Sequence, residues 1–475
     1  MLSRIDAAIG ARVEDAVRAH HRRRLRRIGH EHVLDAHERE WAAGATAPPR
    51  PGNAVDVLVD GAEALPQIAE AIEGARDSVW LAGWHFDPRF RLRRDDARTL
   101  RELLAEAAER VHVRVLAWGG APLPLFHPDR GEVREARDEL VRGTKIEMVL
   151  DARERPFHCH HEKLVVVDDE LAFVGGIDLT SYAGDRFDTS DHPVRPSVGW
   201  HDATSRIRGP AVADVAAHIR LRWAELTGDV VPAPPAPKAA GDVELQVVRT
   251  VPERVYRRLP RGEFSILESY LRALRKARRL VYLENQFLWS PEIVEVLEEK
   301  LRQPPDDRFR LVVVLPARPN NGNDDTRGQL GILAEADALA HRFLACTLYE
   351  HGGKRPVYVH AKIGIVDDEW LTLGSANLNE HSLFNDSEVN VVTHDPGLAR
   401  ATRLRLWSEH LDLPVEEVDR DPTPIVDDVW HPLAQRQLEL LRSGERPTHR
   451  LVRLPHVSRR VGALRGPLSG LLVDG

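Results

Sequence analysis

The sequence predicts an α/β protein in which one chain forms two similar lobes related by a pseudo-twofold axis. A His-x-Lys-x4-Asp motif occurs twice, and corresponding positions of the two copies lie 199 residues apart. The same offset carries Val113 onto Val312, which lie in apolar runs well before the motifs. A constant offset over such a length indicates that a whole unit of alternating strands and helices is duplicated.

A Pro/Ala-rich stretch, VPAPPAPKAAGD, separates the two halves, and this composition favours extended, unpacked chain. Before the first half lies a charged segment with helical character, and after the second half lies a segment with one strong helical pattern. We therefore expect an N-terminal helical extension at 1–50, a first lobe at 51–230, a linker at 231–242, a second lobe at 243–415 and a C-terminal appendage at 416–475.

Within each half, short apolar runs follow helical stretches in the same order. These runs are short and rich in residues that favour strands, which predicts buried strands. The matched runs are 79–84 with 281–287, 113–118 with 312–317, and 146–151 with 346–351. Each half then reaches its motif, in which a further apolar run, an Asp-Asp-Glu turn signal and a second apolar run predict a β-hairpin.

The two motifs have the same construction. A histidine and a lysine two residues apart project to the same side of an extended strand. After the hairpin, a glycine-containing turn brings an Asp or Asn back toward that pair. The first motif contributes His161, Lys163, Asp168, Gly175, Gly176 and Asp178, and the second contributes His360, Lys362, Asp367, Gly374, Ser375 and Asn377.

An imidazole beside an ammonium group suits a phosphate site. The lysine neutralises non-bridging oxygens while the histidine attacks phosphorus or moves a proton. Two copies that face each other supply one imidazole for in-line attack and another to protonate the leaving oxygen. We therefore expect phosphodiester cleavage through a phosphohistidine, with no metal and no other cofactor, because lysines and turn amides can stabilise the charge.

Composition excludes several other classes of protein. The chain has 475 residues, of which 42% are hydrophobic and 29% charged, as in ordinary globular proteins. A net charge of −8 argues against general nucleic-acid binding, and two cysteines cannot form a disulfide framework. No apolar run is long enough for a transmembrane segment, and the N-terminus does not resemble a secretory signal. We expect a cytoplasmic monomer with an internal pseudo-dimer.

With these motifs, the chain resembles the phospholipase D superfamily, which is marked by two His-x-Lys-x4-Asp motifs followed by Gly-Gly/Ser-x-Asn/Asp. The stretches RFDTSDHP, GWHDATSRIRGPAVADV and YLENQF resemble the eukaryotic-type enzymes and their bacterial relatives. The resemblance implies two α/β/α lobes with the active site at their interface. It also implies that His161 is the nucleophile, that His360 is the general acid and then base, and that Asp202 and Glu388 orient these two rings.

Two positions depart from the family pattern. The first motif ends in Asp178 instead of asparagine, which adds a negative charge near the expected phosphate and calls for a cationic partner or a side chain turned away. His381 stands where the family usually has an arginine. The sequence therefore specifies the type of reaction better than it specifies the substrate selectivity.

Several residues near the predicted site allow two interpretations. Trp84 and His85 could line the mouth of the site or pack in the core. Glu284, Asn285 and Gln286 follow a core strand where the loops should converge, so they could contact a headgroup or only cap the strand. The run 158–161, with three histidines and a cysteine, could suggest zinc, but alternation splits it between two faces of a strand, so phosphate chemistry is favoured.

The leading hypothesis is a phospholipase D that hydrolyses the distal phosphodiester of glycerophospholipids to phosphatidic acid and an alcohol, with transphosphatidylation as an accompanying reaction. The expected partner is a phospholipid at a membrane surface, reached by peripheral contact, and no nucleic acid is expected. Three alternatives remain: a cardiolipin synthase-like phosphatidyltransferase, a nuclease or other phosphodiesterase, and a catalytically silent lipid-binding module. Intact His and Lys residues in both motifs argue against the last.

Overall fold

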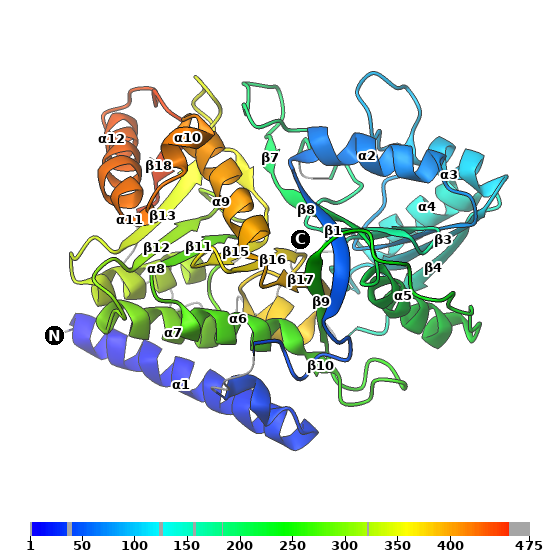
Figure 1. Ribbon diagram of the computed structural model, residues 1–475, viewed down its shortest axis with the longest axis horizontal. Coiled ribbons are helices and arrows are strands. Elements are labelled where there is room, and N and C mark those ends of the chain that lie inside the picture. The colour runs from blue at the N-terminus through cyan, green and yellow to red at the C-terminus, as the bar shows by residue number, and fades with distance from the viewer. Residues whose placement is uncertain are drawn as a thin grey trace.

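The first half of the chain forms a mixed sheet with helices on both faces (Figure 1). The computed structural model describes residues 2–35, 40–122, 127–154, 158–182, 184–320 and 323–455. The first-half strands are β1 (Arg50–Val59), β2 (Ser78–Gly83), β3 (His112–Trp118), β4 (Glu147–Asp151), β5 (Leu164–Val167), β6 (Leu171–Gly175), β7 (Trp200–His201) and β8 (Ala203–Arg208). The helices are α2 (Gly61–Glu73), α3 (Leu100–Ala108), α4 (Arg130–Val141) and α5 (Val212–Thr227).

The second half repeats this arrangement. Its strands are β9 (Val243–Val251), β10 (Glu263–Phe264), β11 (Leu280–Glu284), β12 (Arg310–Val314), β13 (Phe343–Leu348), β14 (Tyr358–Val359), β15 (Ile363–Val366), β16 (Trp370–Gly374) and β17 (Glu388–Thr393). Its helices are α6 (Ser265–Lys276), α7 (Pro291–Arg302), α8 (Asn323–Asp337) and α9 (Pro396–Leu411). The predicted α/β fold with two similar lobes is confirmed.

Strand order shows the duplication directly. The first half reads β1-β8-β6-β5-β2-β3-β4 and the second reads β9-β17-β16-β15-β11-β12-β13. In both, three parallel strands are extended by the antiparallel motif hairpin. The two sheets are joined at the centre, where β1 pairs with β9 through Arg50↔Leu245 and Asn53↔Val243. The lobes therefore share one continuous sheet, which the sequence did not predict.

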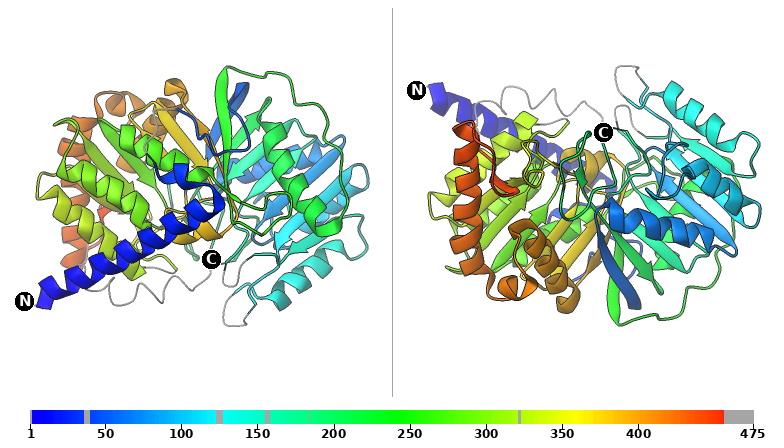
Figure 2. Two further views of the ribbon diagram at one scale, coloured as in Figure 1. Left: turned by 90° about the horizontal axis from the view of Figure 1, so that it is seen from below. Right: turned by 90° about the horizontal axis from the view of Figure 1, so that it is seen from above.

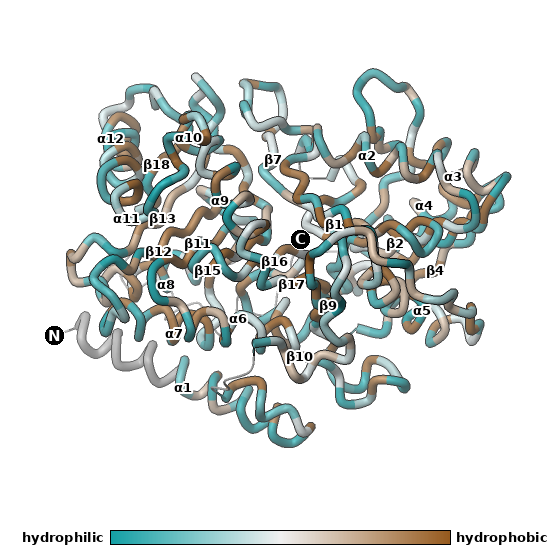
Figure 3. The backbone as a smooth tube through the Cα atoms, in the orientation of Figure 1, coloured by the Kyte–Doolittle hydropathy of each residue, from teal (hydrophilic) through white to brown (hydrophobic). Residues whose placement is uncertain are grey.

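Buried apolar side chains form three main clusters. The hydropathy colouring in Figure 3 shows hydrophobic segments, in brown, along the central strands and parts of the helices. One cluster lies under α2 and α3 on the first sheet, and a second lies under α6, α7 and α8 on the second sheet. The third is continuous across both lobes and includes Trp223 of α5 and Trp407 of α9. Because this core is shared, each half-sheet is covered on both faces and the lobes are fixed relative to each other.

The segments outside the duplication pack mainly on the second lobe. Helix α1 (Leu2–Ile28) runs along α7 (Figure 2), and residues 231–242 form no helix or strand. After α9 come the short helices α10 (Val415–Val418) and α11 (Pro422–Ile425), then α12 (His431–Arg442) and β18 (Leu451–Arg453). Strand β18 pairs with β13, so the C-terminal segment extends the second sheet. Among the described residues, no helix is long and apolar enough to cross a membrane.

Helix α1 is anchored by a buried histidine. His21 Nδ1 lies 2.7 Å from Glu292 Oε1, its Nε2 lies 3.0 Å from Glu380 Oε1, and its ring stacks on Phe384. Although burial disfavours the charged ring, hydrogen bonds to Glu292 and Glu380 raise the pKa of His21 to about 9. The imidazolium therefore links α1 to α7 and to the segment after the second motif.

This anchor makes stability depend on pH. A histidine whose pKa rises on folding stabilises the protein fully below its unfolded pKa of about 6.5, and this contribution is lost as pH rises through about 9. We expect His21→Gln to lower the free energy of unfolding by a few kcal/mol at pH 6 and by much less at pH 10. Denaturant unfolding of both proteins across this range measures the difference, and a constant difference would refute the ionic anchor.

Candidate active site

The motif hairpins set the position of the histidines and lysines. The turns of both hairpins have two consecutive aspartates with positive φ, at 55° and 54° for Asp168 and Asp169 and at 55° and 56° for Asp367 and Asp368. Two such residues in succession form the tight turn that matches the twist of a two-stranded ribbon. Regular pairing begins only after the lysines, at Leu164 and Ile363, so the histidines and lysines lie on extended chain leading into β5 and β15.

Asp168 and Asp367 serve the hairpins rather than the histidines. Asp168 accepts hydrogen bonds from the backbone N–H groups of residues 76–78, immediately before and at the start of β2. Asp367 accepts from residues 278–280 at the corresponding start of β11. Each carboxylate satisfies three backbone donors that have no partner in the ladder, which supports a scaffold role.

Each motif histidine is held by a carboxylate from the other lobe. His161 Nδ1 lies 3.0 Å from Glu388 Oε1, at the start of β17 in the second lobe. His360 Nδ1 lies 2.7 Å from Asp202 Oδ2, which follows β7 in the first lobe. A carboxylate on Nδ1 fixes the ring orientation and leaves Nε2 as the nitrogen that is able to react. The predicted orienting residues thus lie beside the two histidines, and the pairing crosses the pseudo-twofold axis.

Backbone pairing between the lobes produces this exchange. His161 N donates to Ser387 O at 2.9 Å, and His360 N donates to His201 O at 2.7 Å. A short parallel ladder, β7 with β14, pairs Trp200 with Tyr358 immediately before the second contact. The ring centroids of His161 and His360 are 6.4 Å apart, which leaves room between the rings for one tetrahedral phosphorus.

The lysines lie beside the histidines on both sides. Lys163 Nζ donates to His161 O at 2.7 Å and lies 3.4 Å from Asp178 Oδ1, so the departure at Asp178 has a cationic partner. Lys362 Nζ donates to Gln286 Oε1 at 3.4 Å, and the same oxygen accepts from Asn377 Nδ2 at 3.4 Å. Both ammonium groups are buried, and such groups attract a phosphate anion strongly.

The glycine-containing turns pack against or hydrogen-bond to the carboxylates that orient the two histidines. A Cβ at Gly176 would collide with the carboxylate of Asp202, and one at Gly374 would collide with Asn390. At the second turn, Ser375 Oγ donates to Glu388 Oε2 at 2.5 Å, and Ser382 Oγ donates to Oε1 at 2.6 Å. Small residues are needed here because strands β8 and β17 approach the turns closely.

Burial shifts the pKa values of several site residues in the direction that favours their uncharged forms. Burial raises the pKa of Asp202 to about 6 and lowers that of Lys362 to about 7. Burial and then the charges of Lys362, Arg186 and Lys163 hold the pKa of His360 well below its ordinary value. A bound phosphate would oppose these cations, and its negative charge would favour the protonated ring that an acid step requires.

The five predicted substrate residues lie in different surroundings. Gln286 faces the lysine of the second motif, as described above, and donates to Tyr358 Oη at 2.8 Å. Asn285 accepts from the backbone N–H groups of Phe287 and Leu378 and so holds a turn. Trp84 stacks on Trp118, and its ring lies 6.2 Å from that of His85.

Glu284 is turned away from the motif residues. Its carboxylate is fully buried, where it meets His201 Nε2 at 2.8 Å, His410 Nε2 at 2.9 Å and the hydroxyl of Tyr282 at 2.5 Å. With both oxygens engaged in this way, Glu284 serves a buried polar network rather than a headgroup. Sequence alone could not separate it from Gln286, because the chain leaves β11 between the two residues.

Arg186 is a site residue to which the sequence analysis assigned no role, although it opens the stretch RFDTSDHP. Its guanidinium is buried over the ring of Trp200, which lies 4.6 Å from the ring of His360 between centroids. Nε and Nη1 of Arg186 have no hydrogen-bond partner among the described residues. Buried donors without a partner favour the binding of an anionic acceptor. Arg186 is therefore a third cation of the site, beside the two lysines.

Comparisons with known proteins agree with this geometry. A family model described as "Phospholipase D" matches residues 71–198, and one described as "Cardiolipin synthase, PLD-like domain" matches residues 270–408. Together they cover more than half of the chain and contain one motif each. The chain belongs to the phospholipase D superfamily.

Similar curated superfamily members include Phospholipase D A of Dictyostelium discoideum and Phospholipase D1 of Schizosaccharomyces pombe, each 26% identical. These alignments cover 77% and 79% of this chain but 36% of each relative, so the chain spans about a third of their length. Phospholipase D2 of Bos taurus is also 26% identical, over 74% of this chain and 50% of that protein.

A solved structure similar in fold to this superfamily member is phosphatidylserine synthase of Haemophilus influenzae. The two align with a TM-score of 0.52 at 12% identity, over 76% of this chain and 87% of that one. At this identity the likeness shows the shared fold alone.

The two hairpin aspartates provide a test of their role. We expect Asp168→Asn and Asp367→Asn each to destabilise the protein by about 1–3 kcal/mol, because a neutral amide cannot accept three backbone hydrogen bonds as well as a carboxylate. Thermal unfolding measures this loss. Any catalytic turnover per folded molecule should stay within a few-fold of wild type, and a selective loss of turnover without loss of stability would contradict the scaffold role.

Proposed function

We propose that this protein is a phospholipase D that hydrolyses the distal phosphodiester of glycerophospholipids to phosphatidic acid and an alcohol. The observation that carries the proposal is the pair of facing imidazoles, 6.4 Å apart, each oriented by a carboxylate on Nδ1. Membership of the superfamily and the phospholipase D names of the similar curated proteins support the same reaction class.

In the first step, Nε2 of His161 forms a bond to phosphorus. The bond between phosphorus and the headgroup oxygen breaks, and that oxygen takes the proton of the His360 imidazolium. Lys163, Lys362 and Arg186 stabilise the charge on the non-bridging oxygens. The products of this step are the free alcohol and a phosphatidyl group on His161.

In the second step, neutral His360 removes a proton from water, and the water oxygen attacks phosphorus on the face from which the alcohol left. The N–P bond breaks and releases phosphatidic acid, so His161 returns to its starting state. Glu388 and Asp202 hold the two rings in position through both steps and stabilise whichever ring is positively charged.

Phosphatidyl transfer is the second candidate function. The model matched by the second lobe is described as a cardiolipin synthase domain, and the same phosphohistidine can be resolved by an alcohol instead of water. Both outcomes follow from one intermediate, so the acceptor alone distinguishes them.

Exposed apolar side chains suit contact with a membrane. The segment between β6 and β7 exposes Tyr182, Val194 and Val198, with relative accessibilities of 37%, 60% and 39%. The ring of Tyr182 lies 6.0 Å from that of Trp84, and Trp84 stacks on buried Trp118. A row of aromatic rings therefore runs from the surface into the interior. An apolar rim of this kind would help draw a phospholipid from a bilayer.

Product analysis tests the reaction. Incubation with mixed phospholipid vesicles and a little ethanol should yield phosphatidic acid and phosphatidylethanol, detected by mass spectrometry. Glu388→Gln should reduce both products by about 10²-fold or more, since the ring loses its orienting charge. His161→Ala should abolish them. Absence of both products with wild type would reject the phospholipase proposal, and retention by His161→Ala would reject the mechanism.

Trapping the intermediate tests the assignment of the two histidines. His360 acts in both steps, so the test uses a phosphatidyl ester whose leaving group needs no proton, such as p-nitrophenol. With this substrate, His360→Asn should still pass the first step, but it should slow the second step and leave a phosphatidyl group on the chain. Acid-free digestion and tandem mass spectrometry should then place the added mass on His161. Modification of any other residue in this variant, or no modification when product release has stalled, would reverse or reject the assignment.

Vesicle co-sedimentation tests the apolar rim. Val194→Asp, which removes one exposed valine, should weaken binding to vesicles by about tenfold while turnover of a soluble phosphodiester stays unchanged. Leu339→Asp is the matched control, because Leu339 is also highly exposed but lies after α8, outside this segment. Equal weakening in both variants would refute a specific contact through this segment.

A further inference from the structure

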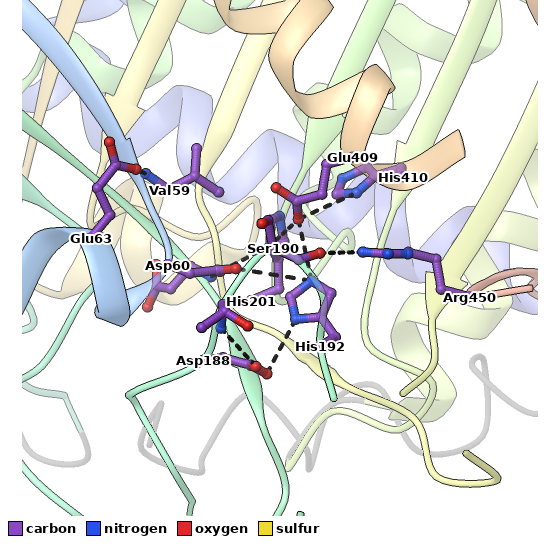
Figure 4. A network of polar contacts seen from close by, with 12 residues as sticks. Val59, Asp60, Glu63, Asp188, Ser190, His192, His201, Glu409, His410 and Arg450 are labelled. Carbon is purple, nitrogen blue, oxygen red and sulfur yellow. Dashed lines mark hydrogen bonds and ion pairs between the residues drawn. The ribbon is translucent and has the colours of Figure 1, made fainter. Parts of the chain in front are cut away.

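A second group of buried titratable side chains, shown in Figure 4, lies next to the candidate active site, and Asp202 N donates to one of its members, Asp60 Oδ1, at 3.0 Å. Its centre is made by two carboxylates and two histidines from four separate parts of the chain: Asp60 directly after β1, His192 in the segment before β7, His201 in β7 and Glu409 in α9. Asp60, His192 and His201 have no exposed surface, and the side chain of Glu409 is 5% exposed.

One ligand atom from each of these four residues lies within 4.8 Å of the other three, which is close enough for all four to bind one metal ion. A zinc ion with bonds of about 2.0–2.1 Å places neighbouring ligand atoms about 3.3–3.4 Å apart. Glu409 Oε1 lies 3.3 Å from His192 Nε2 and 3.6 Å from His201 Nδ1. Asp60 Oδ2 lies 4.0 Å from His192 Nε2, while Asp60 Oδ1 is hydrogen-bonded to His201 Nδ1 at 3.0 Å and accepts from Asp202 N at 3.0 Å.

Three of these atoms lack the partners that buried polar atoms normally have. Asp60 Oδ2, His192 Nε2 and Glu409 Oε1 have no hydrogen-bond partner among the described residues. All three point toward one another, as Figure 4 shows for the side chains that it labels. Burying such atoms without a partner is costly, and a cation at their centre would satisfy all of them together.

The outward-facing nitrogens complete the pattern. His201 Nε2 lies 2.8 Å from Glu284 Oε2, and His192 Nδ1 lies 3.2 Å from Asp188 Oδ2. Metal-binding histidines usually give their second nitrogen to a carboxylate, which fixes the ring and strengthens the ligand. Glu284, turned away from the motif residues, has this supporting position.

We propose that Asp60, His192, His201 and Glu409 bind one divalent cation of the zinc type in a closed tetrahedral site. Nitrogen and oxygen donors in tetrahedral array favour zinc over magnesium or calcium, which prefer six or more oxygen ligands. With four protein ligands the ion has no open position for substrate, so its role is structural. It joins the first lobe to α9 of the second and fixes His201, whose neighbour Asp202 orients His360.

Protonated histidines are the competing explanation. Although burial disfavours charged rings, neighbouring carboxylates raise the pKa of His192 to about 9 and raise that of His201 well above its ordinary value. Two imidazolium ions could therefore balance the carboxylates without a metal. The two explanations differ in whether the folded chain retains a metal ion.

Metal analysis of the full chain decides between them. The protein is produced in zinc-supplemented medium, passed through gel filtration, and its zinc content is measured per folded chain by mass spectrometry. Competition with a chromophoric chelator gives the affinity, and replacement by Co²⁺ reports geometry through visible absorption. The variants are Glu409→Gln, which nearly preserves side-chain size, and Glu284→Gln, which changes only the supporting carboxylate.

A buried histidine outside the group provides the matched control. His218 is fully buried and bonded to Glu162, so His218→Gln tests the effect of losing a buried histidine elsewhere. We expect close to one zinc per wild-type and His218→Gln chain, a tetrahedral Co²⁺ spectrum, and affinity lowered about 10–100-fold by Glu284→Gln and further by Glu409→Gln. Folding of each variant is checked by circular dichroism.

Two results would overturn the proposal. One is a folded wild-type chain that neither carries nor takes up zinc and unfolds at the same temperature with chelator as with added zinc. The other is zinc binding that Glu409→Gln and Glu284→Gln leave unchanged. Because none of these measurements uses catalytic activity, failure of the zinc site and failure of the proposed phospholipase reaction can be told apart.

Discussion

The exchange of carboxylates between the lobes is the constraint on which the rest of the site depends. Glu388 of the second lobe holds His161 of the first, and Asp202 of the first holds His360 of the second. Neither lobe therefore contains both a motif histidine and the carboxylate that orients it. The continuous sheet, the shared core between α5 and α9 and the backbone contacts at Ser387 and His201 all serve to keep this exchange in register.

The exchange concentrates charge where water is largely excluded. Lys163, Lys362 and Arg186 are buried around the two imidazoles, together with the carboxylates of Asp178, Asp202 and Glu388. A bound phosphate diester would face the three cations, and its negative charge would favour protonation of His360. Three buried cations around one pair of imidazoles are the physical basis for expecting phosphodiester chemistry.

Supporting polar networks lie beside both motif segments. Alternation along 160–163 sends His161 and Lys163 into the site and sends Glu162 to the opposite face, where it meets Arg222 and His218 of α5. Near the second motif, the His192–His201 group lies next to Asp202 and supports it in a corresponding way. The proposed metal ion would stiffen the second of these networks, which suits the role proposed for Asp202 of holding the His360 ring through both steps of the reaction.

The sequence by itself determined the duplication, the α/β class, the two motifs and the residue types of the reaction, because these are encoded by local spacing and by a constant offset. Tertiary structure alone decided which carboxylate serves which histidine, that the sheets join through β1 and β9, and that Gln286 faces the motif lysine while Glu284 is turned away. These features depend on contacts between residues more than 70 positions apart, and no local period or propensity records such contacts. Arg186 escaped assignment for the same reason, since its role arises from burial beside Trp200 and not from its neighbours in sequence.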